Sequence, residues 1–294
     1  MAITASMVKE LRTITGAGMM DCKKALSETA GNVEDAIEFL RKKGMAGADK
    51  KASRVAAEGI IAIAISDDNK KAIIAEVNCE TDFVAKGDEF QSFANEIAAI
   101  ALAKNTTDVE AVMNETMASG ETIDTVRRGM VARIGENMAL RSMKIIESEG
   151  GIGQYQHGEK IGVVVAMTGG DDALMRDIAM HIAAANPSAI SEDEVDQKLL
   201  EKERKFQIEQ AADSGKPAEI IEKMIDGRMR KYLQGITLVG QPFIKDPDQT
   251  VEKLLKSNEA TVTAFVRLEV GEGIVIEELD FADEVAAAAA AVTG

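Results

Sequence analysis

The sequence is poor in the residues that build most active sites and disulfide frameworks. Its 294 residues include 2 Cys, 2 His, 2 Tyr and no Trp. Cys22 and Cys79, with His157 and His181, are too few for a Cys/His zinc site and give no disulfide framework. Free thiols fit a reducing compartment, so we expect a cytoplasmic protein with no metal.

Positive charge is also scarce. Lys and Arg number 34 against 50 Asp and Glu, which gives a formal net charge of −16. Such a chain repels phosphate backbones, so we expect no direct nucleic-acid partner. The N-terminal stretch MAITASMVKELR has no apolar signal core, and the apolar run at 285–292 is far shorter than the ~20 residues of a membrane helix. Other proteins are the expected partners, with no membrane contact.

Signatures of bond-making enzymes are missing. No G-x-x-x-x-G-K-[ST] phosphate loop and no G-x-S-x-G elbow is present, and the glycines at 150–153 lack the strand–turn–helix context of a dinucleotide site. His181 falls on an Ala-rich helical face, which indicates a structural role. His157 falls in a Gly-flanked stretch, where we expect an exposed loop. We therefore expect neither a catalytic residue nor a cofactor.

The N-terminal third changes from helical to strand periodicity. Residues 1–46 predict three short helices, the first capped by Thr4, and residues 47–57 predict a linker that is flexible or only partly helical. After the linker, Ile/Val-rich runs at 59–65 and 71–77 flank a polar turn and predict a β-hairpin. This hairpin opens the first core subdomain, which we expect to span residues 58–150.

An internal echo predicts a second copy of this unit. EIAAIALAKN at 96–105 and DIAMHIAAAN at 177–186 are identical at four of ten positions, and each follows an Ile/Val-rich strand. The remaining predictions are a second core subdomain at 151–273, with strands at 161–167, 235–243 and 261–270, a helical hairpin at 192–234 and a C-terminal helical module at 274–294. The fold class is therefore α+β.

One junction carries an apolar excess. NCETDFVAKGDEF, at 78–90, joins a strand to a helix that Asp88 and Gln91 would open as a capping box, yet it contains Phe83-Val84. The second copy makes the same join with TGGDD, at 168–172, which holds only turn and cap residues. Two interpretations remain open: Phe83 covers the sheet as a lid, or it projects as a wedge into a partner.

Two further segments suggest protein contacts. Met19 and Met20 are adjacent on a helix and cannot both point inward, so at least one is expected on the surface, although one could pack under the three helices. In the helical hairpin each arm has one apolar stripe that can pack against the other arm. Apolar residues outside these stripes, such as Leu200 and Ile220, could make a second contact. Homodimerisation through the hairpin stays open beside its interpretation as a packed element.

Seven segments, in order along the chain, together resemble the bacterial translation elongation factor Ts family. They are LRTITGAGMMDCKKAL at 11–26, NCETDFVAK at 78–86, RIGEN at 133–137, YQHG at 155–158, IAMH at 178–181, GQPF at 240–243 and EVGEG at 269–273. The resemblance implies a guanine nucleotide exchange factor for elongation factor Tu, in its GDP-bound and nucleotide-free states. The implied fold is a ubiquitin-associated-like three-helix domain, two related α+β subdomains with antiparallel sheets, a protruding helical hairpin and a C-terminal helical module.

The resemblance also implies functional residues. Thr81, Asp82, Phe83 and Val84 correspond to the segment that displaces the magnesium ion bound with the nucleotide on elongation factor Tu. Met19 and Met20 correspond to the contact with its nucleotide-binding domain, and Ile134, Gly135 and His157 to core contacts. The competing interpretation is an interaction scaffold without exchange activity; a hydrolase or transferase would need a site that the sequence does not reveal.

Overall fold

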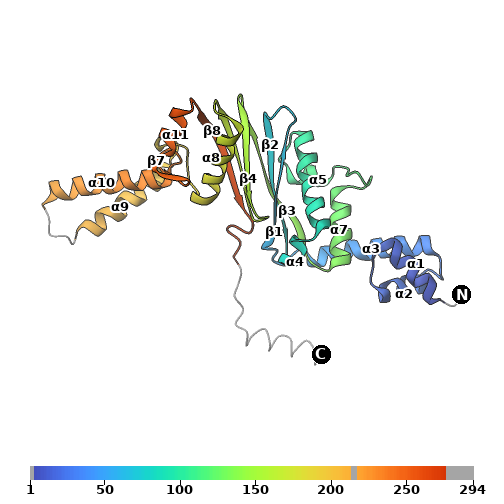
Figure 1. The fold of residues 1–294 in the computed structure, drawn as a ribbon. Helices are drawn as coiled ribbons and strands as arrows, with labels where there is room; N and C mark the ends of the chain where they lie inside the picture. The colour runs from blue at the N-terminus through green and yellow to red at the C-terminus, as the bar shows by residue number, and fades with distance from the viewer. Residues whose placement is uncertain (1–2, 213–216, 276–294) are drawn as a thin grey trace.

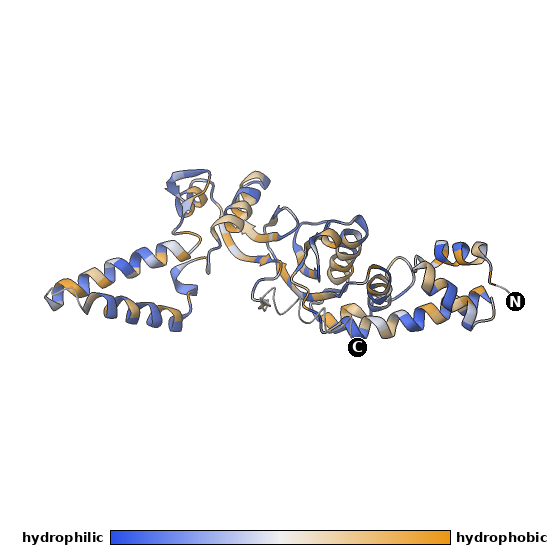
Figure 2. Cartoon of the chain, turned by 90° about the horizontal axis from the view of Figure 1, so that it is seen from below, coloured by the Kyte–Doolittle hydropathy of each residue, from blue (hydrophilic) through white to orange (hydrophobic). Residues whose placement is uncertain are grey.

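The structure is a computed structural model that describes residues 3–212 and 217–275. The described chain has the predicted α+β fold and is elongated. A three-helix domain lies at one end, a two-sheet core in the middle and a helical hairpin at the other end (Figure 1). The same row of three parts is seen after a 90° turn (Figure 2). The C-terminal helical module predicted at 274–294 lies outside the described residues, except for Ile274 and Val275.

The N-terminal domain forms the three predicted helices, α1 (Ala5–Thr15), α2 (Met19–Glu28) and α3 (Val33–Lys51). Thr4 caps α1, because its side chain accepts a hydrogen bond from the Met7 backbone N–H at 3.3 Å. The domain has a small core of its own, made of Val8, Leu11, Cys22, Ala25, Leu26 and Ala36. Helix α3 continues through residues 47–51 of the segment expected as a linker.

The first core sheet has three antiparallel strands in the order β1 (Glu58–Ile65), β2 (Lys71–Cys79), β3 (Met138–Glu147). The predicted hairpin is confirmed, with Ile63 paired to Ile74. Between β2 and β3 the chain forms α4 (Asp82–Ala85), α5 (Asp88–Lys104), α6 (Val109–Met113) and α7 (Ile123–Ile134). The predicted capping box is wrong: Gly87 is the N-cap of α5 and makes no side-chain cap, because Asp88 already lies inside the helix.

The second core sheet repeats this plan. Its strands are antiparallel in the order β4 (Gly151–His157), β5 (Ile161–Thr168), β8 (Thr261–Glu269). Helix α8 (Asp172–Ala185) follows the middle strand β5, as α5 follows the middle strand β2. This is the arrangement that the internal echo predicts. His157 is exposed, as expected. The prediction that it lies in a loop is wrong, because it is the last residue of β4 and pairs with Ile161.

The two sheets pack face to face, with helices on their outer faces (Figure 1). Alternate residues of one strand serve different layers. Ile60 and Ile73 face α5 and α7, whereas Ile61 and Ile74 face the second sheet. The sheets approach so closely at Gly162 that a Cβ there would lie 2.4 Å from Cγ2 of Ile61. The interior between the sheets is therefore shared by both halves of the core.

The hairpin and its base fill the chain between α8 and β8. After a short 3-10 turn (Glu192–Glu194) come α9 (Gln197–Ala212) and α10 (Ala218–Ile236), which pack through Ala211, Ile225 and Met229. Then follow β6 (Pro242–Phe243), β7 (Asp246–Thr250) and α11 (Val251–Ser257). The strand expected at 235–243 is wrong: α10 extends to Ile236, Thr237 makes an isolated bridge to Ala189, and Pro242 and Phe243 form the short strand β6.

No helix within residues 3–212 and 217–275 combines the length and apolar character needed to cross a bilayer. Within the same residues, no group of three or more His, Cys, Asp or Glu side chains could hold a metal ion.

Candidate partner-binding site

The Phe83 segment forms a one-turn helix, α4, between the middle strand of the first sheet and α5. Thr81 is its N-cap and accepts a hydrogen bond from the Val84 backbone N–H at 3.4 Å. Ala85 is buried, and Val84 packs partly against the core of the first sheet. Phe83 points the other way and is 85% exposed. The lid interpretation is therefore wrong, because Val84 and Ala85 already supply the inward contacts of this turn.

Asp82 lies beside the phenyl ring in sequence and is paired with Lys86. The Lys86 ammonium lies 2.7 Å from the Asp82 carboxylate, one helical turn further on. The hydrogen bond from Lys86 lowers the pKa of Asp82, and the more distant Lys160 lowers it further. Asp82 is therefore an ionised carboxylate whose charge Lys86 partly offsets.

A second carboxylate holds the start of the turn from outside. Glu136 accepts from the Thr81 backbone N–H at 3.0 Å with one oxygen and from the Thr81 hydroxyl at 2.8 Å with the other. The Cys79 thiol donates to the Thr81 carbonyl at 3.2 Å. Burial, together with the nearby Glu136 charge, raises the pKa of Cys79 to about 12, so this thiol stays protonated at neutral pH. All three backbone and side-chain polar groups of Thr81 are thus engaged.

Ile134 and Gly135 lie at the end of α7, directly before Glu136. Gly135 ends the helix with φ 93°, a conformation that favours glycine, and its N–H bonds the Val131 carbonyl. Ile134 is partly exposed, at 36%. Through the Glu136–Thr81 contact, the structure brings this pair next to the Phe83 turn. Sequence reasoning missed Glu136, because no local pattern links residues 55 positions apart.

His157 also lies on the side of the core near α4. It ends β4, and Lys160 on the following turn bonds Glu58 of β1 and is close enough to act on Asp82. The His157 ring stacks on Tyr155, with ring centroids 6.5 Å apart. His157 is exposed, whereas Tyr155 packs partly against the core of the second half. The link from this turn to the Phe83 segment is Lys160, which acts on Asp82.

Met19 and Met20 occupy a separate site on the N-terminal domain. They begin α2 and are 60% and 75% exposed, so both face solvent. The prediction that at least one lies on the surface is confirmed. No contact joins them to Phe83, because the two sites lie on different domains. The N-terminal domain is nevertheless fixed to the core through its last helix.

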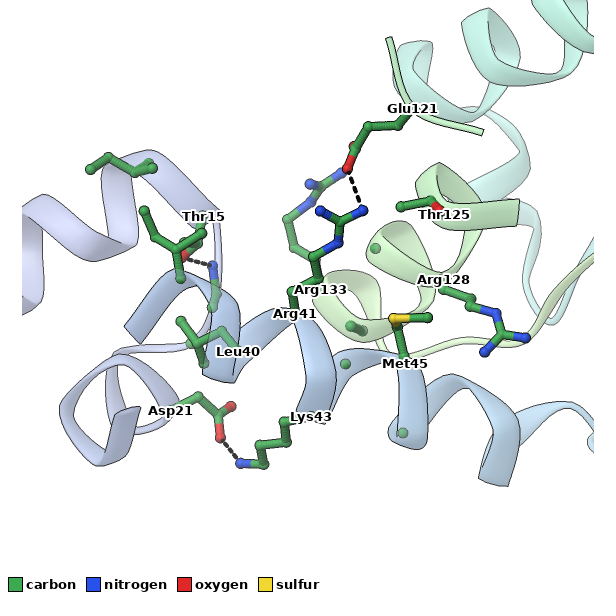
Figure 3. Close-up of a pocket in the computed structure, with 18 of the residues that line it drawn as sticks. Thr15, Asp21, Leu40, Arg41, Lys43, Met45, Glu121, Thr125, Arg128 and Arg133 are labelled. Carbon is green, nitrogen blue, oxygen red and sulfur yellow. Dashed lines mark hydrogen bonds and ion pairs between the residues drawn. The ribbon is translucent and has the colours of Figure 1, made fainter. Parts of the chain in front are cut away.

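That attachment is the crossing of α3 and α7 (Figure 3). The helices approach so closely that a Cβ on Gly44 would lie 2.9 Å from the Ala132 Cβ. Arg41 pairs with Glu121 across the crossing at 3.1 Å. A cavity of about 370 Å³ lies here, between α1, α2, α3 and α7. Four of its basic residues have acidic partners; the pairs are Arg41–Glu121, Lys43–Asp21, Arg128–Asp49 and Arg133–Glu89. We therefore assign the cavity to the domain contact.

Comparisons with known proteins point to one family. The model of the family described as Elongation factor TS matches residues 80–272. A protein of Hydrogenovibrio crunogenus named Elongation factor Ts is 78% identical over 294 residues, covering 100% of both chains. Proteins of the same name from Methylococcus capsulatus and Thioalkalivibrio sulfidiphilus are 56% and 55% identical, each over 98% of this chain and 98% and 99% of their own lengths.

Proposed function

Because this chain belongs to the elongation factor Ts family, we propose that it is a guanine nucleotide exchange factor for elongation factor Tu in translation elongation. Exchange of this kind is thermodynamic coupling. A factor that binds the nucleotide-free state better weakens nucleotide binding by the same ratio. No covalent bond is made or broken, so the chain acts as an exchange factor and not as a bond-making enzyme. Its partner is met in the GDP-bound form and held in the nucleotide-free form.

The single observation that carries a mechanism is the exposed phenyl ring of Phe83. Nucleotide phosphates in such partners are held by a glycine-rich loop, a helix N-terminus and Mg²⁺. We propose that Phe83 inserts among the elements around the magnesium ion and disturbs its coordination. Burying one exposed Phe side chain is worth about 1.5–3 kcal/mol, which the partner would gain only in the opened state.

The neighbours of Phe83 have supporting roles in this proposal. Thr81 sets the first turn of α4, and Val84 holds that turn on the core. Asp82 places a carboxylate near the site, which disfavours returning phosphate, although its pairing with Lys86 reduces this effect. Ile134, Gly135 and His157 would widen the contact around the turn. Met19 and Met20 would bind the nucleotide-binding domain of the partner independently.

The variant Phe83→Ala tests the wedge. We expect stimulated GDP release to slow about 10- to 150-fold, the range that corresponds to losing about 1.5–3 kcal/mol of contact in the opened state. The unfolding free energy should change little, because the ring is 85% exposed. Stopped-flow release of a fluorescent guanine nucleotide from elongation factor Tu measures the first, and urea unfolding measures the second.

Ile244→Ala is the matched control for this test. Ile244 is an exposed apolar residue, at 47%, in the loop between β6 and β7 of the second subdomain. It should leave release unchanged. If the Phe83→Ala variant accelerated GDP release as the parent does, the wedge mechanism would be wrong, and the exchange function itself would stand. A chain that binds the partner without any acceleration of release would instead be an interaction scaffold.

A second proposal concerns the helical hairpin. Among the residues of the hairpin that the structure describes, the exposed large apolar side chains are Leu199, Phe206, Ile208 and Ile220. Leu200, by contrast, packs partly against the hairpin's own cluster. We propose that the exposed set forms a homodimer contact at high concentration. Light scattering would then give twice the chain mass of 31.4 kDa. A mass of one chain across the concentration series would remove this proposal.

A further inference from the structure

The short helix that carries Phe83 cannot hold its own position. With four residues, α4 is below the length at which a helix is stable in water. Its inward anchors are Ala85 and the partly buried Val84, and both follow Phe83 in the sequence. The segment before Phe83 therefore needs a separate restraint, and that restraint acts on Thr81.

Glu136 supplies this restraint with both of its carboxylate oxygens. One accepts the Thr81 N–H and the other the Thr81 hydroxyl, at 3.0 and 2.8 Å. The same hydroxyl oxygen accepts from the Val84 N–H, so one chain of hydrogen bonds runs from Glu136 through Thr81 into α4. Hydrogen bonds to an ionised carboxylate are stronger than neutral ones, and a bidentate pair also fixes direction. Glu136 thus restrains the N-cap residue of α4.

A reciprocal contact fixes Glu136 in turn. Glu80, the residue before Thr81, accepts from the Asn137 backbone N–H at 2.6 Å. The buried Asn137 side chain donates to the carbonyls of Ala52 and Arg54, at 3.3 and 2.8 Å. These carbonyls belong to the segment that leaves α3. The end of α7, the start of α4 and the end of α3 are therefore joined at one polar junction.

We propose that Glu136 is a positioning residue for nucleotide exchange: it holds Thr81 so that Phe83 is presented in the direction needed for insertion. This inference rests on the proposed function. Glu136 acts through Phe83 and contributes nothing to exchange once the phenyl ring is absent. Its substitution therefore affects the opening step, while the remaining contacts with the partner keep their strength.

Exchange kinetics on the full chain test the proposal. Glu136→Ala removes both acceptors and should slow saturating release of a fluorescent GDP analogue from elongation factor Tu about tenfold, a size that losing a charge-assisted hydrogen bond supports. Glu136→Gln keeps one acceptor and can donate to the Thr81 hydroxyl, so it should recover release to within about twofold of the parent. In a Phe83→Ala background, Glu136→Ala should have no further effect.

The matched control is Glu96→Ala. Glu96 also accepts a backbone N–H, from Ala118 at 2.6 Å, in the same subdomain but away from α4. It should leave release per folded molecule unchanged. The proposal would be overturned if Glu96→Ala slowed release as much as Glu136→Ala does. It would also be overturned if Glu136→Ala slowed release equally in the parent and in the Phe83→Ala background, because either result would show a merely structural role.

A second measurement is independent of exchange. The chain has no Trp, so Phe83→Trp places a single reporter on α4. Glu136→Ala should lower the fluorescence anisotropy of this Trp, and Glu96→Ala should not. An unchanged anisotropy would overturn the positioning role even if exchange were confirmed. If the parent chain failed to accelerate release while the anisotropy fell as expected, the proposed function would fail and the restraint on Phe83 would stand.

Discussion

At the scale of single residues, His181 has both ring nitrogens engaged inside the second half of the core. Its Nδ1 accepts from the Ile244 backbone N–H at 3.2 Å, so its Nε2 carries the proton and donates to the Gln241 side-chain oxygen at 3.0 Å. The side chain is 1% exposed, and burial lowers its pKa from the usual value. The structural role expected for this residue follows from a neutral, fully bonded imidazole.

This environment makes stability depend on pH. Because the folded pKa of His181 is lowered, the unfolded chain takes up a proton first as pH falls below about 6.5. We expect the contribution of His181 to stability to be complete above that pH and to decline below it, by at most about 1.4 kcal/mol per pH unit. Urea unfolding of the parent and His181→Gln between pH 7.5 and 5 should show a shallower acid decline in the variant.

His157→Gln is the control, since it removes an exposed imidazole at the end of β4. An acid decline that is equally steep in His181→Gln and the parent would contradict the assignment.

Phe83 shows how far residue-level prediction reaches. The sequence showed an aromatic residue, Phe83, that a strand-to-helix junction does not need. It did not decide whether the ring covers the sheet as a lid or projects as a wedge. The direction of the ring depends on Val84 and Ala85 taking the inward positions and on Glu136 holding Thr81. The last contact joins residues far apart in the chain, so no local pattern contains it.

At the scale of elements, α3 is longer than its sequence predicts. KKGMAGADKK, at 42–51, has no sustained apolar face, and two glycines lower its helix propensity. The helix persists because it crosses α7, where Gly44 permits the close approach and Ala48 is buried in the first core cluster. Tertiary packing overrides local preference here. By contrast, the strands at 59–65, 71–77, 161–167 and 261–270 were predictable, because their apolar runs have strong strand character.

The two glycines of α3 give a matched pair of variants. A Cβ on Gly47 meets nothing within 4 Å, so Gly47→Ala should stabilise α3 by up to about 1 kcal/mol through helix propensity. A Cβ on Gly44 meets Ala132 at 2.9 Å, so Gly44→Ala should lose that gain or reverse it. Hydrogen exchange of the α3 amides measures both. Equal protection in the two variants would contradict the proposed role of Gly44 in the crossing.

At the scale of the whole molecule, the candidate contacts form two separate groups. Phe83, Ile134 and His157 lie on the core, whereas Met19 and Met20 lie on the N-terminal domain, which α3 fixes in place. If both groups contact one partner, as proposed, binding at one raises the effective concentration at the other.

Replacing Met19 and Met20 together by Gln should therefore weaken affinity for elongation factor Tu and leave release at saturation nearly unchanged. Phe83→Ala should instead lower the rate of release at saturation and leave the affinity nearly unchanged. A titration of stimulated release against the concentration of this chain separates the half-saturating concentration from the maximal rate. A lower maximal rate in the double Met variant, with unchanged half-saturation, would contradict this division. Both Met side chains are already exposed, so folding should be unaffected.

The topology of the two halves has one more consequence. In each, the chain leaves the helix behind the middle strand and returns later as the third strand, β3 or β8. In the first half, the inserted helices α6 and α7 bury residues such as Val112 and Met130 in the core, so they are part of it. In the second half, the hairpin arms α9 and α10 pack on a small cluster of their own. The hairpin could therefore be lengthened or shortened without changing the interior between the two sheets, whereas removal of α6 and α7 would open the first core.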